Sequence, residues 1–329
     1  GIIRFLYSAG NFGHLTILQL LIGFAAVSML GGVSLALLQT DTKRLLAYHS
    51  ISQMGYVLLG IGIGTQLSLT GALYHSINHA LFKGLLFLCA GAVIYSTGTR
   101  NLHDLGGLRK KMPVTAIVCL VACLAISGVP PLNGFISKML LVKSTDEITW
   151  IKVVFLLTSA GTFASFLKLF SCSFLVTLPQ KLTKVKEVPW LMLLPMLFLA
   201  ILNLILGLFP NLILSEALSP VVGEIFTSHS VMRVDDWDIV SALPPLLLGG
   251  LIYYLGIRSK LFFINESSFW QKVRCRFRKI SIDKFYTGVA GMVKRTCIIL
   301  RNIEHCSFST HLSFVLIFLT GLVIVLFMR

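Results

Sequence analysis

Three basic side chains share one stripe of an apolar segment. His75, His79 and Lys83 follow one another at four-residue intervals within the apolar run 67–96. Side chains at this spacing lie on the same face of an α-helix. An ammonium group near the centre of a bilayer costs at least about 2.5–3.5 kcal/mol, so a chain keeps it where it faces protein or a hydrated path. The stripe predicts a route for protons or other cations.

A second ionisable residue follows an interruption in the next apolar run, 114–144. The interruption at residues 127–134 contains Gly128, Pro130, Pro131 and Gly134, and Lys138 comes one turn later. Proline removes a backbone donor and clashes with the preceding helical turn. Such a break persists in lipid only where protein buries it or where it lines a watery cavity. A broken helix beside an ionisable residue is typical of transporter ion sites.

Lys168 is a third lysine within an apolar run, residues 150–178. One alternative is that Lys138 and Lys168 extend along their helices to the membrane interface, as long basic side chains do. This alternative fits Lys83 less well, because apolar sequence continues on both sides of it. We therefore predict that the three lysines, His75, His79 and water together move protons across the membrane.

The composition is that of a polytopic membrane protein. The 329-residue chain is 56% hydrophobic and 12% charged, and its mean hydropathy is +0.86. The formal net charge of +15 invites a nucleic-acid function, but the basic residues cluster in loops between apolar runs. No basic soluble domain with interleaved aromatic residues is present in the sequence. We predict lipids and membrane subunits as partners, and no nucleic acid.

The sequence offers no credible redox centre. Its seven cysteines form no CxxC pair and no metal-type spacing. A haem held by His75 or His79 with His49 is a third hypothesis. It is disfavoured because two histidines one turn apart cannot face one iron from opposite sides, and because Lys83 follows one turn later. We expect no catalytic nucleophile, metal or cofactor on this chain.

About 20 apolar residues span a bilayer, and eight runs of this kind predict an all-α membrane protein. They are residues 15–39, 45–64, 67–96, 114–144, 150–178, 188–209, 238–257 and 312–328. Loops at residues 41–44, 109–111 and 181–186 are basic, whereas residues 146–147 and 216–238 are acidic. Because basic loops mark the cytoplasmic side, we predict the basic loops to be cytoplasmic and the C-terminus to lie outside.

The predicted organisation has four parts. Residues 1–178 form a bundle, and residues 179–256 add further transmembrane helices. Residues 257–311 form a basic amphipathic segment on the cytoplasmic side, lying on the membrane or along a partner, and residues 312–329 form the last span. The chain opens on Gly1 and Ile2 with no initiator methionine. We therefore expect it to be the C-terminal half of a longer or a split protein.

Four motifs in order resemble one known family. Residues 39–56, QTDTKRLLAYHSISQMGY, are similar to the QTDIKRLLAYSSISQ-G-Y signature of the antiporter-like subunits. Residues 75–83 match that family's H-x3-HAxFK helix, residues 105–113 its LGGL…MP loop, and residues 127–138 its second broken helix. The family comprises subunits L, M and N of respiratory complex I, ion-translocating subunits of membrane-bound hydrogenases, and Mrp-type sodium/proton antiporters. Residues 146–329 match only in layout.

The resemblance implies two inverted, pseudosymmetric five-helix bundles joined by a hydrated polar axis. It implies that Lys83 is the central lysine, that Lys138 is the residue at the second broken helix, and that His75 and His79 are relays. The family's first broken helix, with its glutamate–lysine pair, would precede Gly1. Some relatives carry glutamate at the position of Lys138.

The resulting hypothesis is an ion-translocating subunit, for protons or sodium, of a redox-driven complex in a bacterial or archaeal rather than a mitochondrial membrane. Iron–sulfur clusters, with a flavin or a nickel–iron site, would then lie on partner subunits, among which we expect other antiporter-like chains and the missing N-terminal half. The alternative is a subunit of a stand-alone Mrp-type antiporter. The identity of the neighbouring chains would distinguish the two.

Overall fold

The computed structural model describes residues 14–146, 148–218, 220–222, 238–258, 291, 292 and 295. Contacts divide the chain into two units, Gly1–Ile264 and Asn265–Arg329, and the helices named below belong to the first. They are α2 (His14–Leu37), α3 (Thr42–Ile63), α4 (Gln66–Thr97), α5 (Pro113–Ser127), α6 (Asn133–Lys143), α7 (Thr149–Phe170), α8 (Trp190–Leu208), α9 (Asn211–Ile213) and α11 (Leu243–Arg258). No strand occurs in the described part of the chain, so the predicted all-α class is confirmed.

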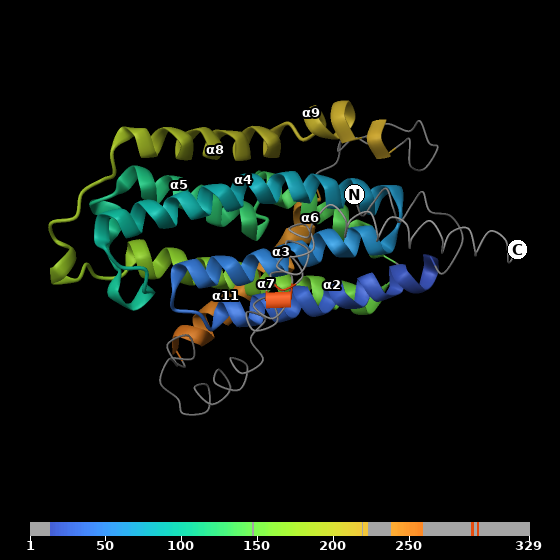
Figure 1. Ribbon diagram of the computed structural model, residues 1–329, viewed down its shortest axis with the longest axis horizontal. Helices are drawn as coiled ribbons and strands as arrows, with labels where there is room; N and C mark the ends of the chain where they lie inside the picture. Colours follow the sequence, from blue (N-terminus) through green and yellow to red (C-terminus); the bar gives the residue numbers. More distant parts are fainter. Residues whose placement is uncertain are drawn as a thin grey trace, which may run out of the picture. The chain divides into compact units, whose positions relative to one another are not determined.

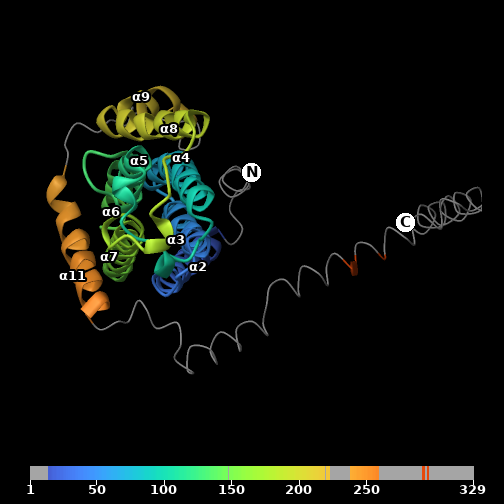
Figure 2. The same cartoon turned by 90° about the vertical axis from the view of Figure 1, so that its left-hand side faces the viewer.

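The long helices form a bundle around α3 and α4 (Figure 1). Helix α3 packs between α2 and α4, and α4 also contacts α5, α6 and α8. Helix α7 contacts α2 and α5, and α11 packs along α7. Seen from the end, α8 and α9 cover the side of the bundle formed by α4 and α5, and α11 flanks the side formed by α6 and α7 (Figure 2). The centre of the bundle is thus walled by protein on several sides.

Every predicted span before residue 258 coincides with described helices. Five stretches are long and apolar enough to cross a membrane: Ile17–Leu37, Gln66–Thr97, Thr149–Leu175, Trp190–Leu208 and Ile239–Gly256. Helix α3 has 22 residues, but it begins with basic residues and includes His49, Ser52 and Gln53 in its middle. The predicted span at 312–328 and nearly all of the predicted amphipathic segment 257–311 lie outside the described residues.

The predicted interruption of the span 114–144 is present. Helix α5 ends at Ser127 and α6 begins at Asn133. Gly128 ends α5 in a left-handed conformation with φ of 80°, which glycine adopts without steric cost. Gly207 of α8 packs against the break so closely that an added Cβ would lie 2.1 Å from the Pro131 carbonyl oxygen. The two ends of the break, Gly128 and residues 132–134, are therefore buried by protein, whereas Val129 and Pro130 are half-buried and Pro131 is exposed.

Close helix packing brings α2 against α3. A Cβ on Gly32 of α2 would lie 2.6 Å from the backbone nitrogen of Ser52, and one on Gly55 of α3 would lie 2.9 Å from the Ala25 oxygen. The Ser52 hydroxyl donates to the Met29 carbonyl oxygen over 2.9 Å. Small residues at both surfaces let the two backbones approach, as is usual between membrane helices.

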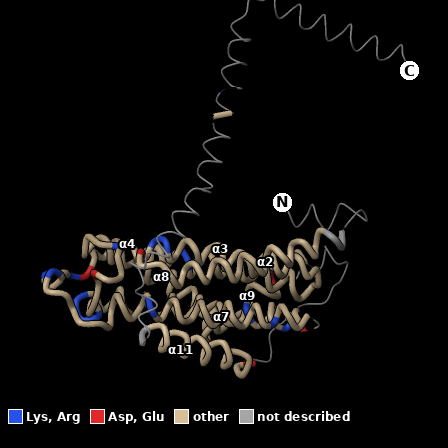
Figure 3. Tube along the Cα trace, turned by 90° about the horizontal axis from the view of Figure 1, so that it is seen from below, with Lys and Arg blue, Asp and Glu red and all other residues tan. Residues whose placement is uncertain are grey.

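The loops at one end of the bundle pack on one another. Gly106 and Gly107 lie against the backbone of Thr177 and Leu178. The Glu187 carboxylate accepts hydrogen bonds from the first turn of α5, at 2.9 Å from Val114 N and 2.6 Å from Thr115 Oγ1. Most basic residues of the described helices and loops gather at this end, and single basic residues lie along the bundle (Figure 3). The loops predicted to be basic and cytoplasmic are therefore neighbours in space.

Candidate functional site

Lys83 of α4 is buried in the bundle, with 5% of its surface exposed. Its ammonium donates a hydrogen bond to the Leu46 carbonyl oxygen of α3, and Nζ lies 5.7 Å from the centroid of the Phe87 ring. No acidic side chain forms an ion pair with it in the described structure. The charge is therefore stabilised by a backbone dipole and an aromatic face, as is expected for a lysine that faces protein rather than lipid.

His75, two turns before Lys83 on α4, joins three helices. It is fully buried, and its Nε2 lies 3.1 Å from Gln53 Oε1 of α3, to which it donates. Its Nδ1 lies 2.9 Å from the Ser137 hydroxyl of α6, and in the neutral imidazole the single proton of that hydroxyl is shared between Nδ1 and the Gly134 carbonyl oxygen at 3.2 Å. Ser137 precedes Lys138, so this pair of hydrogen bonds links α3 directly to the segment that follows the break.

Lys138 is placed by the break itself. With 6% of its surface exposed, it donates from Nζ to the Ile126 carbonyl oxygen at the end of α5 over 2.9 Å. Its Nζ lies 5.4 Å from the centroid of the Tyr56 ring. Gly128 leaves room for it, since a Cβ there would lie 3.0 Å from Lys138 Cδ. The carbonyls freed at the end of α5 are thus available to the ammonium.

Gly134, on the other side of the break, allows α6 to pack closely against α5. A Cβ at this position would lie 1.9 Å from the Ala125 carbonyl oxygen. Asn133, at the start of α6, pairs with Asn78 of α4: its amide donates to Asn78 Oδ1 over 3.0 Å, and Asn78 Nδ2 donates to the Asn133 carbonyl oxygen over 3.2 Å. This reciprocal pair holds α6 against the helix that contains Lys83.

A cavity of about 250 Å³ lies beside Lys138, between α6, α7 and α11. Its wall is mostly apolar and includes Phe135, Met139 and Leu156, and Lys152 also contributes to it. The hydroxyl of Ser159, another lining residue, is hydrogen-bonded to Tyr56 at 2.9 Å. The cavity gives Lys138 a neighbouring space that is large enough for several water molecules.

Lys168 of α7 is buried at the end of α2, with 2% of its surface exposed. Its Nζ donates to the carbonyl oxygens of Leu37 and Gln39 at 2.6 and 2.7 Å. Cations at a helix C-terminus are stabilised by the unpaired carbonyls there. The structure does not place this side chain on the hydrogen-bonded line from His75 to Ser137.

His79 lies between His75 and Lys83 on α4 and is half-buried. Its ring stands edge-on to Phe82, with centroids 5.6 Å apart. Its Nε2 is buried and has no hydrogen-bond partner within the described ranges.

Residues 1–167 match the family described as NADH:quinone oxidoreductase/Mrp antiporter, TM. The chain belongs to this family. It is 39% identical over 215 residues to NADH-quinone oxidoreductase subunit N of Desulforudis audaxviator, covering 61% of this chain and 43% of the relative. It is 32% identical over 284 residues to Na(+)/H(+) antiporter subunit A1 of Staphylococcus aureus, covering 78% of this chain and 35% of the relative. The chain therefore spans less than half the length of these two relatives.

A solved structure, that of the membrane-bound sulfane sulfur reductase, an archaeal respiratory membrane complex, is also similar. The likeness has a TM-score of 0.61 and 28% identity, and it covers 94% of this chain and 56% of the other. The similarity of fold thus extends beyond the residues that match the family.

Within this antiporter-family chain, the sequence analysis missed part of the polar axis. Gln53 and Ser137 hold His75, and Tyr56 lies beside Lys138, yet none of them was predicted as a site residue. His49 was considered only as a haem ligand, but it is fully buried in the bundle. A signal was present, because residues 49, 53 and 56 lie on one stripe of α3. The sequence does not show which neighbouring helix this stripe faces.

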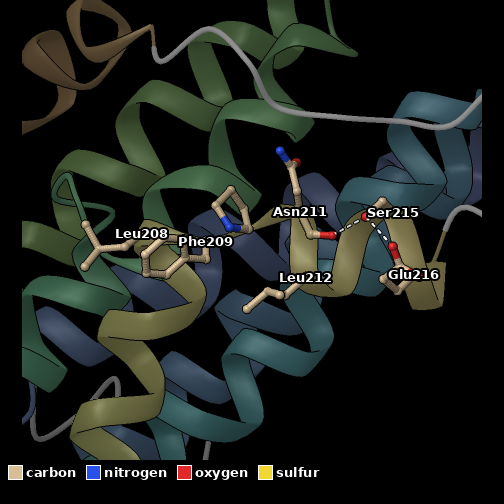
Figure 4. Close-up of a pocket in the computed structure, with 7 residues that line it drawn as sticks. Leu208, Phe209, Asn211, Leu212, Ser215 and Glu216 are labelled. Atoms are coloured by element: carbon tan, nitrogen blue, oxygen red, sulfur yellow. Dashed lines mark hydrogen bonds between the residues drawn. The ribbon is translucent and has the colours of Figure 1, made fainter.

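The remaining candidate sites are a metal centre and a second pocket. The described residues contain no group of three or more His, Cys, Asp or Glu side chains placed to hold a metal. A separate pocket of about 310 Å³ lies where α8 meets α9 (Figure 4) and is lined by Leu208, Phe209, Leu212 and Glu216, among others. None of the described residues that line this pocket is a lysine or a histidine, and the pocket is separate from Lys83 and Lys138.

Proposed function

We propose that this chain is an ion-translocating membrane subunit that moves protons, or sodium, along the buried axis between Lys83 and Lys138. The observation that supports this most directly is the row of buried polar groups between the two lysines. Its hydrogen-bonded part runs from Gln53 through His75 to Ser137, and Lys83 contacts the same helix, α3, at Leu46. Each lysine donates to a backbone carbonyl, and neither forms an ion pair with a carboxylate of the described residues. An ammonium held in this way can release its proton to a neighbouring group without breaking a strong ion pair.

The roles differ along the axis. Lys83 and Lys138 are the proposed proton-binding groups, and His75 is the relay between them, because it can accept at one ring nitrogen while it donates at the other. Gln53 and Ser137 orient its ring. His79 and Lys168 are proposed as further members of the path, and Pro130, Pro131, Gly128 and Gly134 as the break that admits Lys138. If the ion is sodium, freed carbonyls such as that of Ile126 are suitable oxygen ligands.

We further propose that the subunit works within a redox-driven complex, with electron transfer on partner subunits. The similarity to a quinone oxidoreductase subunit and to a respiratory membrane complex supports this assignment. Iron–sulfur clusters and a flavin or nickel–iron site are then expected on those partners and no cofactor on this chain. Both ring nitrogens of His75 are hydrogen-bonded, which disfavours it as a haem ligand. An Mrp-type antiporter subunit is the alternative, supported by the similarity to subunit A1.

The test is the variant Lys83→Met in the purified complex, reconstituted into lipid vesicles. We expect assembly to be retained, because methionine has a similar size and no buried charge, and translocation to be almost abolished. Acidification of the vesicles is followed with a pH-sensitive dye, driven by the redox reaction of the complex or by an imposed sodium gradient. Lys143→Met, an exposed lysine on α6, is the matched control. Wild-type pumping by Lys83→Met would refute the proposal.

Mass spectrometry of the intact complex distinguishes the redox-driven complex from the Mrp-type antiporter. Iron–sulfur subunits that copurify in stoichiometric amounts support the redox-driven complex. A complex made only of membrane subunits, active with a sodium gradient alone, supports the antiporter.

A further inference from the structure

His49 lies on α3 between the contacts that this helix makes with the two lysines. Leu46 accepts the hydrogen bond of Lys83, and the Tyr56 ring lies beside Lys138. Leu46 and Tyr56 are ten residues apart, which is about 15 Å along a helix axis. Helix α3 therefore reaches from one lysine to the other, and side chains between residues 46 and 56 on the same face lie between them.

Two polar side chains occupy that face. Residues 46, 49, 53 and 56 alternate three- and four-residue steps, which keeps them on one stripe. His49 and Gln53 are both fully buried. Gln53 Oε1 accepts from His75 and so connects the stripe to Ser137 and Lys138. His49 is the ionisable group on the stripe that is nearest in sequence to the Lys83 contact.

The surroundings of His49 give no packing reason for an imidazole. Neither Nδ1 nor Nε2 has a hydrogen-bond partner among the residues that the structure describes. The ring instead packs on Phe166 of α7, with centroids 4.6 Å apart. A buried polar atom without a partner costs about 1–3 kcal/mol, and a leucine would fill a similar volume without that cost. Gln53 Nε2, one turn along, is also unpartnered.

We propose that His49 is a proton relay between Lys83 and His75, so that the path follows α3. This inference rests on the proposed function. In the forward direction the Lys83 ammonium loses a proton, one His49 ring nitrogen gains it, and the other ring nitrogen releases a proton through water toward His75. Nε2 of His75 accepts this proton in the tautomer that carries its hydrogen on Nδ1, and the Nδ1 proton then leaves toward Lys138. Only N–H bonds and the O–H bonds of water form and break, and the imidazole returns to its neutral form. Gln53 is a positioning residue that holds His75. The competing route follows α4 through His79.

The test uses the intact complex in vesicles, with His49→Leu and His49→Gln as variants and His103→Leu as the control. His103 lies in an exposed loop and receives the same substitution. We expect both His49 variants to translocate protons about tenfold more slowly or worse. His49→Leu should at the same time unfold at the same or a higher temperature, because it removes two unpartnered nitrogens. A structural role would lower both quantities together.

The relay is refuted if either His49 variant folds and translocates at the wild-type rate. It is also refuted if translocation falls only in proportion to a lower unfolding temperature in both variants. Lys83→Met, measured alongside, separates this inference from the proposed function. If Lys83→Met is inactive and the His49 variants are active, only the relay is wrong, and loss of activity in His79→Leu would then assign the route to α4. If Lys83→Met is active, the proposed function itself is wrong.

Discussion

At the scale of single residues, the buried lysines of this chain differ in what holds them. Lys83 and Lys138 each donate to one carbonyl and lie near an aromatic ring. Lys168 donates to two carbonyls at the end of α2. Removing Lys168 would therefore leave two partly buried acceptors without this donor, which costs stability. Replacing Lys168 by an apolar residue would therefore change both the stability of the fold and the rate of transport.

The variant Lys168→Arg separates these effects. Arginine donates to the same carbonyls but does not release its proton in proteins. If Lys168 takes part in proton transfer, Lys168→Arg should assemble and unfold like the wild type and translocate at least about tenfold more slowly. Vesicle acidification and thermal unfolding of the purified complex measure the two quantities. Translocation at the wild-type rate would instead assign Lys168 to capping α2 alone.

At the scale of elements, the sequence predicted the helices better than the contacts between them. The break at residues 127–134 was predictable, because proline and glycine act locally on the backbone. The predicted spans before residue 258 also coincide with helices, because hydropathy depends on the segment itself. Which helix faces Lys83 was not predictable. That α3 supplies Leu46, His49 and Gln53 to the axis depends on its packing between α2 and α4, and no periodicity within α3 identifies those neighbours.

The cavity between α6, α7 and α11 is likewise a product of packing, and it leads to a prediction. Leu156 of α7 lines the cavity, whereas Leu157, its neighbour, is 44% exposed on the outside of the bundle. Leu156→Trp should fill part of the space beside Lys138 and slow translocation several-fold without preventing assembly. Leu157→Trp adds the same bulk outside and should be neutral. Equal rates in the two variants would show that ions do not use this cavity.

At the scale of the whole molecule, the distribution of charge predicts how the described bundle sits in the membrane. The loops that contain Arg109, Lys110 and Lys181 pack together at one end. The end that carries the α6–α7 connection has Asp146 paired with Lys152 at 2.7 Å. Basic loops are retained on the cytoplasmic side. Because all the loops of the basic end pack together, they must lie on the same side of the membrane, and one orientation satisfies each of them.

Cysteine labelling in intact cells tests this orientation. Lys110 and Glu216 are both exposed in the structure, so Lys110→Cys and Glu216→Cys should both be reactive once the membrane is permeabilised. In intact cells we expect a membrane-impermeant maleimide to label Glu216→Cys above the level of the parent protein and to leave Lys110→Cys unlabelled. The reverse pattern would show that the bundle has the opposite orientation in the membrane. Equal labelling of the two positions would contradict a single orientation. The outcome also shows which side of the membrane the Lys138 cavity faces. The cavity is lined by Lys152, which pairs with Asp146 of the α6–α7 connection, and that connection is predicted to lie outside. Labelling of Glu216→Cys alone would therefore make Lys138 the member of the axis that exchanges ions with the outer side.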